Sequence, residues 1–236
     1  MEFYLGDKIR LLGYDLNPMR LRPGEAIAVT LYWKALGEIG TSYTVFNHLL
    51  DLQGRVQGQS DGIPGSGHIL TTEWYPGEII VDRYYVVLDP EAPPGEYALE
   101  VGMYDWMTLE RLPVYDRSGG SLGDPILLGP IRVEPLGLSA YRITHPTAFN
   151  LGGKVRLLGY DLAPTIVYPG GTLHLALYWQ TIKEMEEDYT VFTHLIDGSS
   201  HIWGQMDHPP LGGAYPTSSW QVGEVIRDGM RSLSIS

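Results

Sequence analysis

The strongest constraint on the fold of this chain is an internal repeat. The segment from Phe3 to Pro18 reads FYLGDKIRLLGYDLNP, and the segment from Phe149 to Pro164 reads FNLGGKVRLLGYDLAP. The correspondence continues without a gap at an offset of 146 residues, and more than a third of the 90 aligned pairs are identical. Identity at that level is far above chance, so the chain contains two copies of one module.

The repeat predicts the domain organisation. Copy one is assigned to residues 1–135, a linker to 136–148 and copy two to 149–236. Ser236 aligns with Pro90, so copy two has no counterpart of residues 91–135. We therefore expect copy two to be an incomplete module with an uncovered strand edge and apolar face. Copy one or a second chain is expected to cover them, which predicts a homodimer.

Each copy is predicted to consist of strands. In residues 26–35, Trp33 and its alternate apolar neighbours lie on one face and Tyr32 lies on the other, and residues 172–181 repeat this pattern. A period of two is typical of a half-buried antiparallel strand. Further strands are expected at 8–14, 43–50, 55–60, 79–88, 96–105 and 126–134. The predicted fold class is all-β, with two tandem antiparallel β-sandwich modules, immunoglobulin-like or jelly-roll-like, the second incomplete.

The composition of the chain limits the classes of partner that it is expected to bind. The net charge is −12, which disfavours nucleic acid and anionic membrane surfaces because both need clustered Lys and Arg. The chain has no cysteine, so it has no disulfide, thiolate metal site or Cys nucleophile. No apolar run approaches the roughly 20 residues of a membrane span, so this segment is not expected to insert into a membrane.

The repeated motifs point to a family. A module with LGYDL, LYW, YTVFNHLLD, GQSDG and PPGEYALEVGMYD resembles the C-terminal β-sandwich repeats of certain large bacterial multi-spanning membrane proteins. The membrane part of those proteins is similar to mannosyltransferases that use polyprenyl-phosphate sugars. The resemblance covers nearly all of copy one and the present part of copy two. It implies an extracytoplasmic accessory region of a membrane-anchored parent, with catalysis in the membrane part.

One motif suggests a hydrolase. Residues 58–62 read GQSDG, which matches the G-x-S-x-G element with Ser60 as nucleophile. That element needs a strand–turn–helix context, whereas this one ends a predicted hairpin strand. Copy two has Met206 in place of the serine. The match is interpreted as coincidental, and no catalytic residue is expected.

Histidine and acidic residues recur in both copies. His48 and Asp51 are three apart, so on a strand they point to opposite faces and cannot share a metal. His48 is interpreted as a strand histidine with satisfied hydrogen bonds and Asp51 as a turn residue. The remaining acidic candidates for a structural Ca²⁺ are Asp61, Asp82 and Asp207, with Asp228 as the twin of Asp82. Loop capping explains these residues equally well, and no other cofactor is predicted.

Aromatic residues suggest a carbohydrate partner. The chain has 16 Tyr and 6 Trp, and sugar-binding sandwiches use exposed rings as platforms. The candidates, all expected to be at least partly exposed, are Trp74, Trp220, Trp106, Tyr32 and Tyr178. The simpler interpretation is that these amphipathic rings cover strands and corners.

Three hypotheses follow. The leading one is a non-catalytic accessory region with an interaction or structural role, whose partner is a protein or a carbohydrate. The alternative is a carbohydrate-binding module. The third, a hydrolase using Ser60, requires a catalytic constellation that the motifs do not supply.

Overall fold

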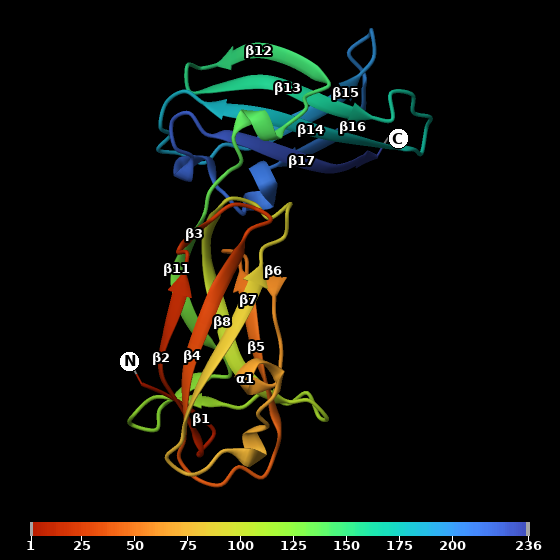
Figure 1. Ribbon diagram of the computed structural model, residues 1–236. Helices are drawn as coiled ribbons and strands as arrows, with labels where there is room; N and C mark the ends of the chain where they lie inside the picture. Colours follow the sequence, from red (N-terminus) through yellow and green to blue (C-terminus); the bar gives the residue numbers. More distant parts are fainter. Residues whose placement is uncertain (1, 235–236) are drawn as a thin grey trace. The chain divides into compact units, whose positions relative to one another are not determined.

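The computed structural model describes residues 2–234, and these residues are almost entirely β-structure (Figure 1). They divide into two compact units. The first comprises residues 2–92 and 96–134, and the second comprises residues 93–95 and 135–234. The sheets are largely antiparallel, and β11 and β3 form a short parallel pair. The predicted all-β, sandwich-like fold class is confirmed.

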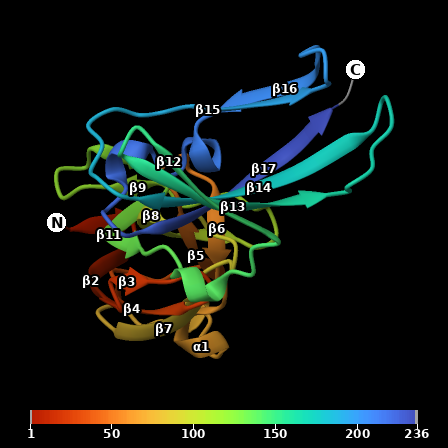
Figure 2. The same ribbon diagram turned by 90° about the horizontal axis from the view of Figure 1, so that it is seen from above.

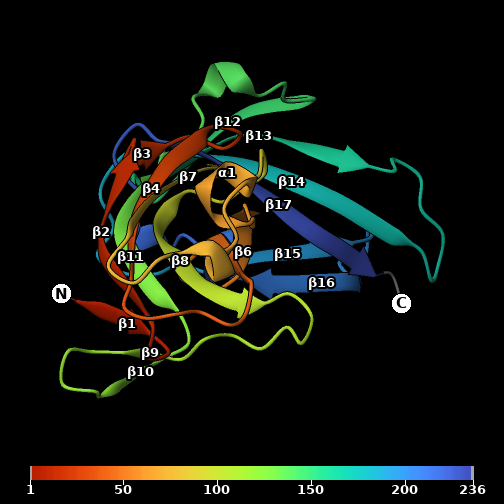
Figure 3. The ribbon, with the colours of Figure 1, turned by 60° about the horizontal axis from the view of Figure 1, so that its bottom comes forward.

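The first unit is built from two sheets that face each other (Figure 3). The six-stranded sheet has the order β10-β9-β1-β2-β4-β7, and the five-stranded sheet has the order β3-β11-β8-β5-β6. The strands of the first sheet are β1 (Phe3–Leu5), β2 (Ile9–Asn17), β4 (Ala26–Ala35), β7 (Ile79–Val87), β9 (Val114–Tyr115) and β10 (Ser121–Gly123). Those of the second are β3 (Arg20–Leu21), β5 (Tyr43–Leu50), β6 (Val56–Gln59), β8 (Gly95–Asp105) and β11 (Ile126–Val133).

The alternation of apolar and polar residues predicts the positions of the long strands of this unit correctly. β4 and β5 have the predicted bounds, and β8 begins one residue earlier than predicted. Four short strands, β1, β3, β9 and β10, were not predicted, because two or three residues are too few to display a period of two. Residues 116–120 connect β9 to β10, which pair antiparallel.

The core of the first unit comes from the inward-facing residues of both sheets. Along β4, alternate residues from Ile27 to Trp33 are at most 1% exposed. Along β8, Leu99, Val101 and Met103 are fully buried. Burying a large apolar side chain contributes roughly 1.5–3 kcal/mol, so these two faces stabilise the sandwich.

The second unit has a four-stranded sheet, of order β12-β13-β14-β17, and a separate hairpin (Figure 2). The sheet consists of β12 (His145–Leu151), β13 (Val155–Ala163), β14 (Thr172–Thr181) and β17 (Val225–Ser234). The hairpin consists of β15 (Val191–Ile196) and β16 (Ile202–His208). β12 begins within the segment 136–148 that the repeat assigned to the linker.

The core of the second unit is smaller. Its buried cluster is formed by Leu177, Trp179, Met185, Tyr215, Trp220 and Ile226. In β14 the period of two is lost, since Ala176 and Tyr178 are buried together with Leu177 and Trp179. The expectation that Tyr178 lies on an open polar face is therefore wrong.

The helical segments are single turns. They are α1 (Pro64–Gly67) and the 3-10 turns η1 (Thr71–Glu73), η2 (Leu138–Ala140), η3 (Pro210–Gly213) and η4 (Thr217–Ser219). Within residues 2–234, none has the length and apolar character that membrane crossing requires.

Candidate functional site

Two of the predicted aromatic platforms are core residues. Trp74 and Trp220 are each 3% exposed and pack into the cores of their units. Each indole follows a 3-10 turn, η1 or η4, which directs the ring inward. The Trp220 indole also donates a hydrogen bond to the carbonyl oxygen of Tyr215, at 3.0 Å. The expectation that these two rings are half-exposed is wrong.

The two predicted tyrosines hold neighbouring strands together. The Tyr32 hydroxyl donates to Asp15 Oδ2 at 2.7 Å. The Tyr178 hydroxyl donates to Asp161 Oδ2 at 2.5 Å, and its ring packs edge-on against Tyr141 at 5.3 Å. Tyr141, which follows η2, thus covers a ring that the alternation placed in solvent.

Tyr32 is partly exposed, as expected, and Trp106 is the most exposed of the five predicted aromatic residues. It is 62% exposed in the turn that follows β8, where Met107 and Leu109 are 75% and 72% exposed. Asp105 begins this turn and accepts a hydrogen bond from the Met107 amide at 2.8 Å. The turn is an exposed apolar knob and not a groove lined by several rings.

Asp82 and its twin Asp228 anchor matching turns. Asp82 Oδ1 accepts a hydrogen bond from the Gly65 amide at 2.9 Å, and Asp228 Oδ1 accepts one from the Leu211 amide at 2.8 Å. Gly65 and Leu211 are equivalent positions, and both have positive φ, at 66° and 54°. Left-handed backbone is unfavourable for leucine, so a buried carboxylate that binds this amide offsets local strain.

These contacts assign the recurring aspartates a role in folding. The second oxygen of Asp82, Oδ2, accepts a hydrogen bond from the Tyr84 hydroxyl at 2.7 Å. Burial raises the pKa of Asp82, and the hydrogen bond from Tyr84 partly opposes this shift. In the part of the chain that the structure describes, no three His, Asp or Glu side chains are grouped as a metal ion would need.

Asp51 is a turn residue, as predicted. Its Oδ1 accepts hydrogen bonds from the Gln53 and Arg55 amides at 2.9 and 3.0 Å. Asp197, its twin, accepts equivalent bonds from the Ser199 and His201 amides at 2.8 and 3.0 Å. The partners of His48 are Glu100 and Asp61, and that of His194 is Asp207, so neither histidine is paired with the aspartate three residues after it in the part of the chain that the structure describes.

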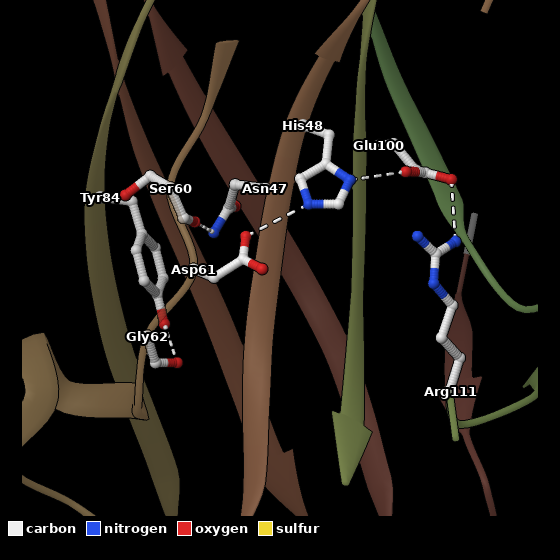
Figure 4. Close-up of polar contacts among 8 residues, drawn as sticks. All are labelled: Asn47, His48, Ser60, Asp61, Gly62, Tyr84, Glu100 and Arg111. Carbon is white, nitrogen blue, oxygen red and sulfur yellow. Dashed lines mark hydrogen bonds and ion pairs between the residues drawn. The ribbon is translucent and has the colours of Figure 1, made fainter. Parts of the chain in front are cut away.

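The main polar cluster of the first unit is centred on His48 (Figure 4). His48 Nδ1 lies 3.0 Å from Glu100 Oε2, and Nε2 lies 3.2 Å from Asp61 Oδ1. Glu100 Oε1 accepts a hydrogen bond from Arg111 Nη1 at 3.1 Å. We call these four residues, His48, Asp61, Glu100 and Arg111, the His48 cluster.

Strand register brings the His48 cluster together. His48 of β5 is directly opposite Glu100 of β8, and Asp61 lies just after β6, the neighbour of β5 on the other side. The cluster lies on the outer face of the five-stranded sheet, because Asn47 and Leu49, adjacent to His48, point inward and are fully buried. It is partly shielded, and the side chain of His48 is 14% exposed.

The ring of Phe46 packs against two members of the His48 cluster. The Arg111 guanidinium lies 4.3 Å from the centre of the Phe46 ring, and the His48 ring is 5.2 Å from the same centre. Phe46 is 1% exposed although it lies on the outer face. Opposite it is Gly102, where a Cβ atom would come within 2.4 Å of the ring. The glycine therefore makes room for the phenyl ring.

The electrostatics favour a protonated His48. The hydrogen bond to Asp61 raises the pKa of His48, and the bond to Glu100 acts in the same direction, whereas burial lowers it. Both ring nitrogens then donate to carboxylates. An imidazolium held in this way has no lone pair available to act as a general base.

Ser60 does not form a nucleophile elbow. Its amide donates to the Asn47 carbonyl oxygen at 2.9 Å, and Asn47 Nδ2 donates to the Ser60 carbonyl oxygen at 3.0 Å (Figure 4). The helix that follows, α1, has four residues, and Gly65 and Ser66 within it have left-handed backbone. The strand–turn–helix context of a hydrolase is therefore missing at this position.

Two members of the His48 cluster are recognisable from the sequence, and the other two are not. His48 and Asp61 were singled out because they recur in both copies. Glu100 and Arg111 were not, because they become neighbours of His48 only through the pairing of β5 with β8. Alternation along 96–105 places Glu100 on the polar face, which was the available signal.

The cluster makes stability depend on pH. The pKa of His48 is higher in the folded state than in the unfolded state. The protonated His48 side chain therefore stabilises the fold fully below the unfolded pKa of about 6.5, and this stabilisation is lost as pH rises through the folded pKa. We expect His48→Gln to lower the free energy of unfolding by about 1 kcal/mol at pH 6, and by less at alkaline pH.

Urea unfolding of both proteins at several pH values measures this difference. His68→Gln is the control, because His68 is exposed in the loop after α1. A difference between wild type and His48→Gln that is the same at every pH would show that His48 does not act through its charge.

Comparison with models of known protein families gives no match, and comparison with curated proteins gives none either.

Proposed function

We propose that this chain is a non-catalytic tandem β-sandwich accessory region of a larger, membrane-anchored, glycosyltransferase-like protein. Its role there is structural or one of interaction, on the extracytoplasmic side. The repeated motifs support the kind of parent protein, and the His48 cluster supports the absence of catalysis.

The proposal that the chain is non-catalytic is supported by the pairing of charged groups within the His48 cluster. Both nitrogens of His48 face carboxylates, and the free oxygen of Glu100 faces Arg111. Each charge of the cluster is offset by a neighbour, which supports a structural role for these four residues. Such a network across three strands fixes their register and stabilises the sheet.

The carbohydrate-binding alternative is weaker. A saccharide platform needs several rings exposed on one surface, and Trp74, Trp220 and Tyr178 are buried. Trp106 alone among the predicted tryptophans is an exposed ring, and its neighbours in the turn are aliphatic. Protein is therefore the favoured class of partner.

Cell fractionation tests the proposal. An antibody raised against this chain is expected to detect a polypeptide much longer than 236 residues in the membrane fraction, released by detergent and not by salt. The isolated chain is expected to release no sugar from a polyprenyl-phosphate mannose donor. Detection of a product of only this length in the soluble fraction, or turnover by the isolated chain, would contradict the proposal.

A further inference from the structure

The two copies of the repeat surround the same buried aspartate with different side chains. In copy one, the Tyr84 hydroxyl donates to Asp82 Oδ2 at 2.7 Å and lies 3.4 Å from the carbonyl oxygen of Gly62. The positions of Tyr84 and Gly62 are occupied in copy two by Met230 and His208. Copy two therefore has no phenol at the position that binds the carboxylate, and it has an imidazole at the neighbouring position.

Strand register shows that these positions are structurally equivalent. Tyr84 is opposite Val29 in the pairing of β7 with β4, and Met230 is opposite Leu175, the twin of Val29, in the pairing of β17 with β14. A Cβ atom on Gly62 would lie 3.5 Å from the Tyr84 ring. A side chain at this position of the repeat therefore lies beside the space that the tyrosine ring fills in copy one.

The hydrogen bonding of His208 defines its tautomer. Nδ1 lies 2.7 Å from the carbonyl oxygen of Pro209, which can only accept, so Nδ1 carries a hydrogen. Nε2 is buried and has no hydrogen-bond partner within residues 2–234. In the neutral ring Nε2 is a buried lone pair, and in the protonated ring it is a buried N–H donor. Either form is unfavourable without a partner, because an unsatisfied polar group is costly to bury.

The acidic group that acts on His208 is Asp228. Its side chain is fully buried, Oδ1 accepts from the Leu211 amide, and Oδ2 has no hydrogen-bond partner in the part of the chain that the structure describes. Burial raises the pKa of Asp228, whereas the hydrogen bond from the Leu211 amide and the charge of His208 oppose this shift. Asp207 precedes His208 on β16, so it points to the other face of the strand, where it lies 4.0 Å from His194.

We propose that His208 and Asp228 form a pH-sensitive pair that binds one proton and thereby stabilises the η3 turn of the second unit. With the proton on His208 Nε2 or on Asp228 Oδ2, the two atoms join in a hydrogen bond, and Asp228 Oδ1 keeps its bond to the Leu211 amide. When the proton is released to water, a lone pair and a carboxylate oxygen stay buried with no donor between them. The turn then loses stability, because Asp228 offsets the left-handed backbone at Leu211.

The equivalent place in the first unit has a donor that does not respond to pH in the neutral range. Burial raises the pKa of Tyr84, so its hydroxyl keeps its proton and donates to Asp82. The exchange of this tyrosine for a histidine at the neighbouring position turns a permanent donor into one that requires protonation. The proposal concerns the second unit only and does not depend on the nature of the parent protein.

Urea unfolding of the full chain at several pH values, followed at the amide NMR signals of β14 and β17, tests the proposal. An unfolded histidine releases its proton near pH 6.5, and the pair is expected to hold its proton to a higher pH. Over that interval the folded state binds one proton more than the unfolded state. The folding equilibrium constant of the second unit is therefore expected to fall by up to about tenfold per pH unit.

Variants assign the pH dependence to the pair. His208→Gln is expected to remove the fall, because a glutamine amide donates a hydrogen bond without titrating. The double variant His208→Gly, Met230→Tyr reproduces the residues of copy one and is expected to remove it as well. His174→Gln is the matched control, because His174 is exposed on β14, and it should keep the wild-type response. His194 and Asp207 are present in all of these proteins, so their contribution cancels in the comparison.

Two results would overturn the proposal. One is a folding equilibrium constant of the second unit that is the same from neutral to alkaline pH in the wild type, a measurement that does not depend on whether a variant folds. The other is an equal fall in His208→Gln and the wild type, which would place the titrating group elsewhere.

Discussion

Replacement of Asp82 by alanine is expected to lower the free energy of unfolding of the first unit by about 3 kcal/mol. The Asp82 side chain is fully buried and accepts hydrogen bonds from the Gly65 amide and the Tyr84 hydroxyl. Alanine leaves both donors without this acceptor, and each unsatisfied buried group costs about 1–3 kcal/mol. Equilibrium urea unfolding at pH 7 measures the change.

Asparagine at the same position is the control. It keeps the shape and an acceptor oxygen for the Gly65 amide, and the Tyr84 hydroxyl can rotate to accept from the new amide group. Burial raises the pKa of Asp82, so the carboxyl stabilises the folded state most in its protonated form, below about pH 3.9. Ionisation offsets part of that stabilisation as pH rises through the folded value. A neutral amide avoids that cost at pH 7, so Asp82→Asn is expected to change stability by less than about 1 kcal/mol.

The same variants distinguish turn anchoring from calcium binding. If Asp82 anchors the turn at Gly65, added Ca²⁺ leaves the melting temperature of the wild type unchanged. A rise in melting temperature with Ca²⁺ that disappears in both variants would show that the carboxylate is a ligand.

Replacement of Gly58 by alanine is expected to cost about 3 kcal/mol, at the upper end of overpacking effects. Gly58 is in β6, and a Cβ atom there would lie 2.4 Å from the carbonyl oxygen of Val87. That oxygen belongs to β7, which pairs with β4 and cannot move without disturbing the six-stranded sheet. The clash between the new Cβ atom and this oxygen can be removed only if β6 and β7 move apart at the edge of the sandwich.

Gly13 provides the matched control for this substitution. It is also a strand glycine, in β2, but a Cβ atom there meets nothing within 4 Å. Gly13→Ala is expected to change the free energy of unfolding by less than about 0.5 kcal/mol. Thermal or urea unfolding of the two variants measures the contrast, and similar losses in both would show that close approach of β6 to β7 is not the cause.

The local alternation of apolar and polar residues was sufficient to predict the long strands. The alternation that ends at Trp33 and the one that runs through Leu99 follow from the geometry of an extended chain, so the sequence alone shows which faces are buried. Asp51 was recognisable as a turn residue for the same reason, since its hydrogen bonds reach residues two, four and six positions later.

The exposure of aromatic side chains near turns was not predictable from the local sequence pattern. Trp74, Trp220 and Trp106 all lie close to turns, yet the first two are buried and the third is 62% exposed. The direction of a ring beside a turn depends on the path of the backbone and on the space beneath it. Tyr178 shows the same limit, because Tyr141, 37 positions earlier in the sequence, covers it.

The sequence by itself determined the duplication, the all-β class and the positions of the long strands, because these depend on residue identity and on contacts between near neighbours. Only the tertiary structure decided that Glu100 and Arg111 join His48 and Asp61, and that Phe46 is buried while Phe192 is exposed. Those outcomes depend on which strand lies beside which, and strand pairing joins residues far apart in the chain. The two copies of the repeat have nearly the same residues in β5 and β15, so their difference in exposure comes from the neighbouring strand and not from the sequence of the strand itself.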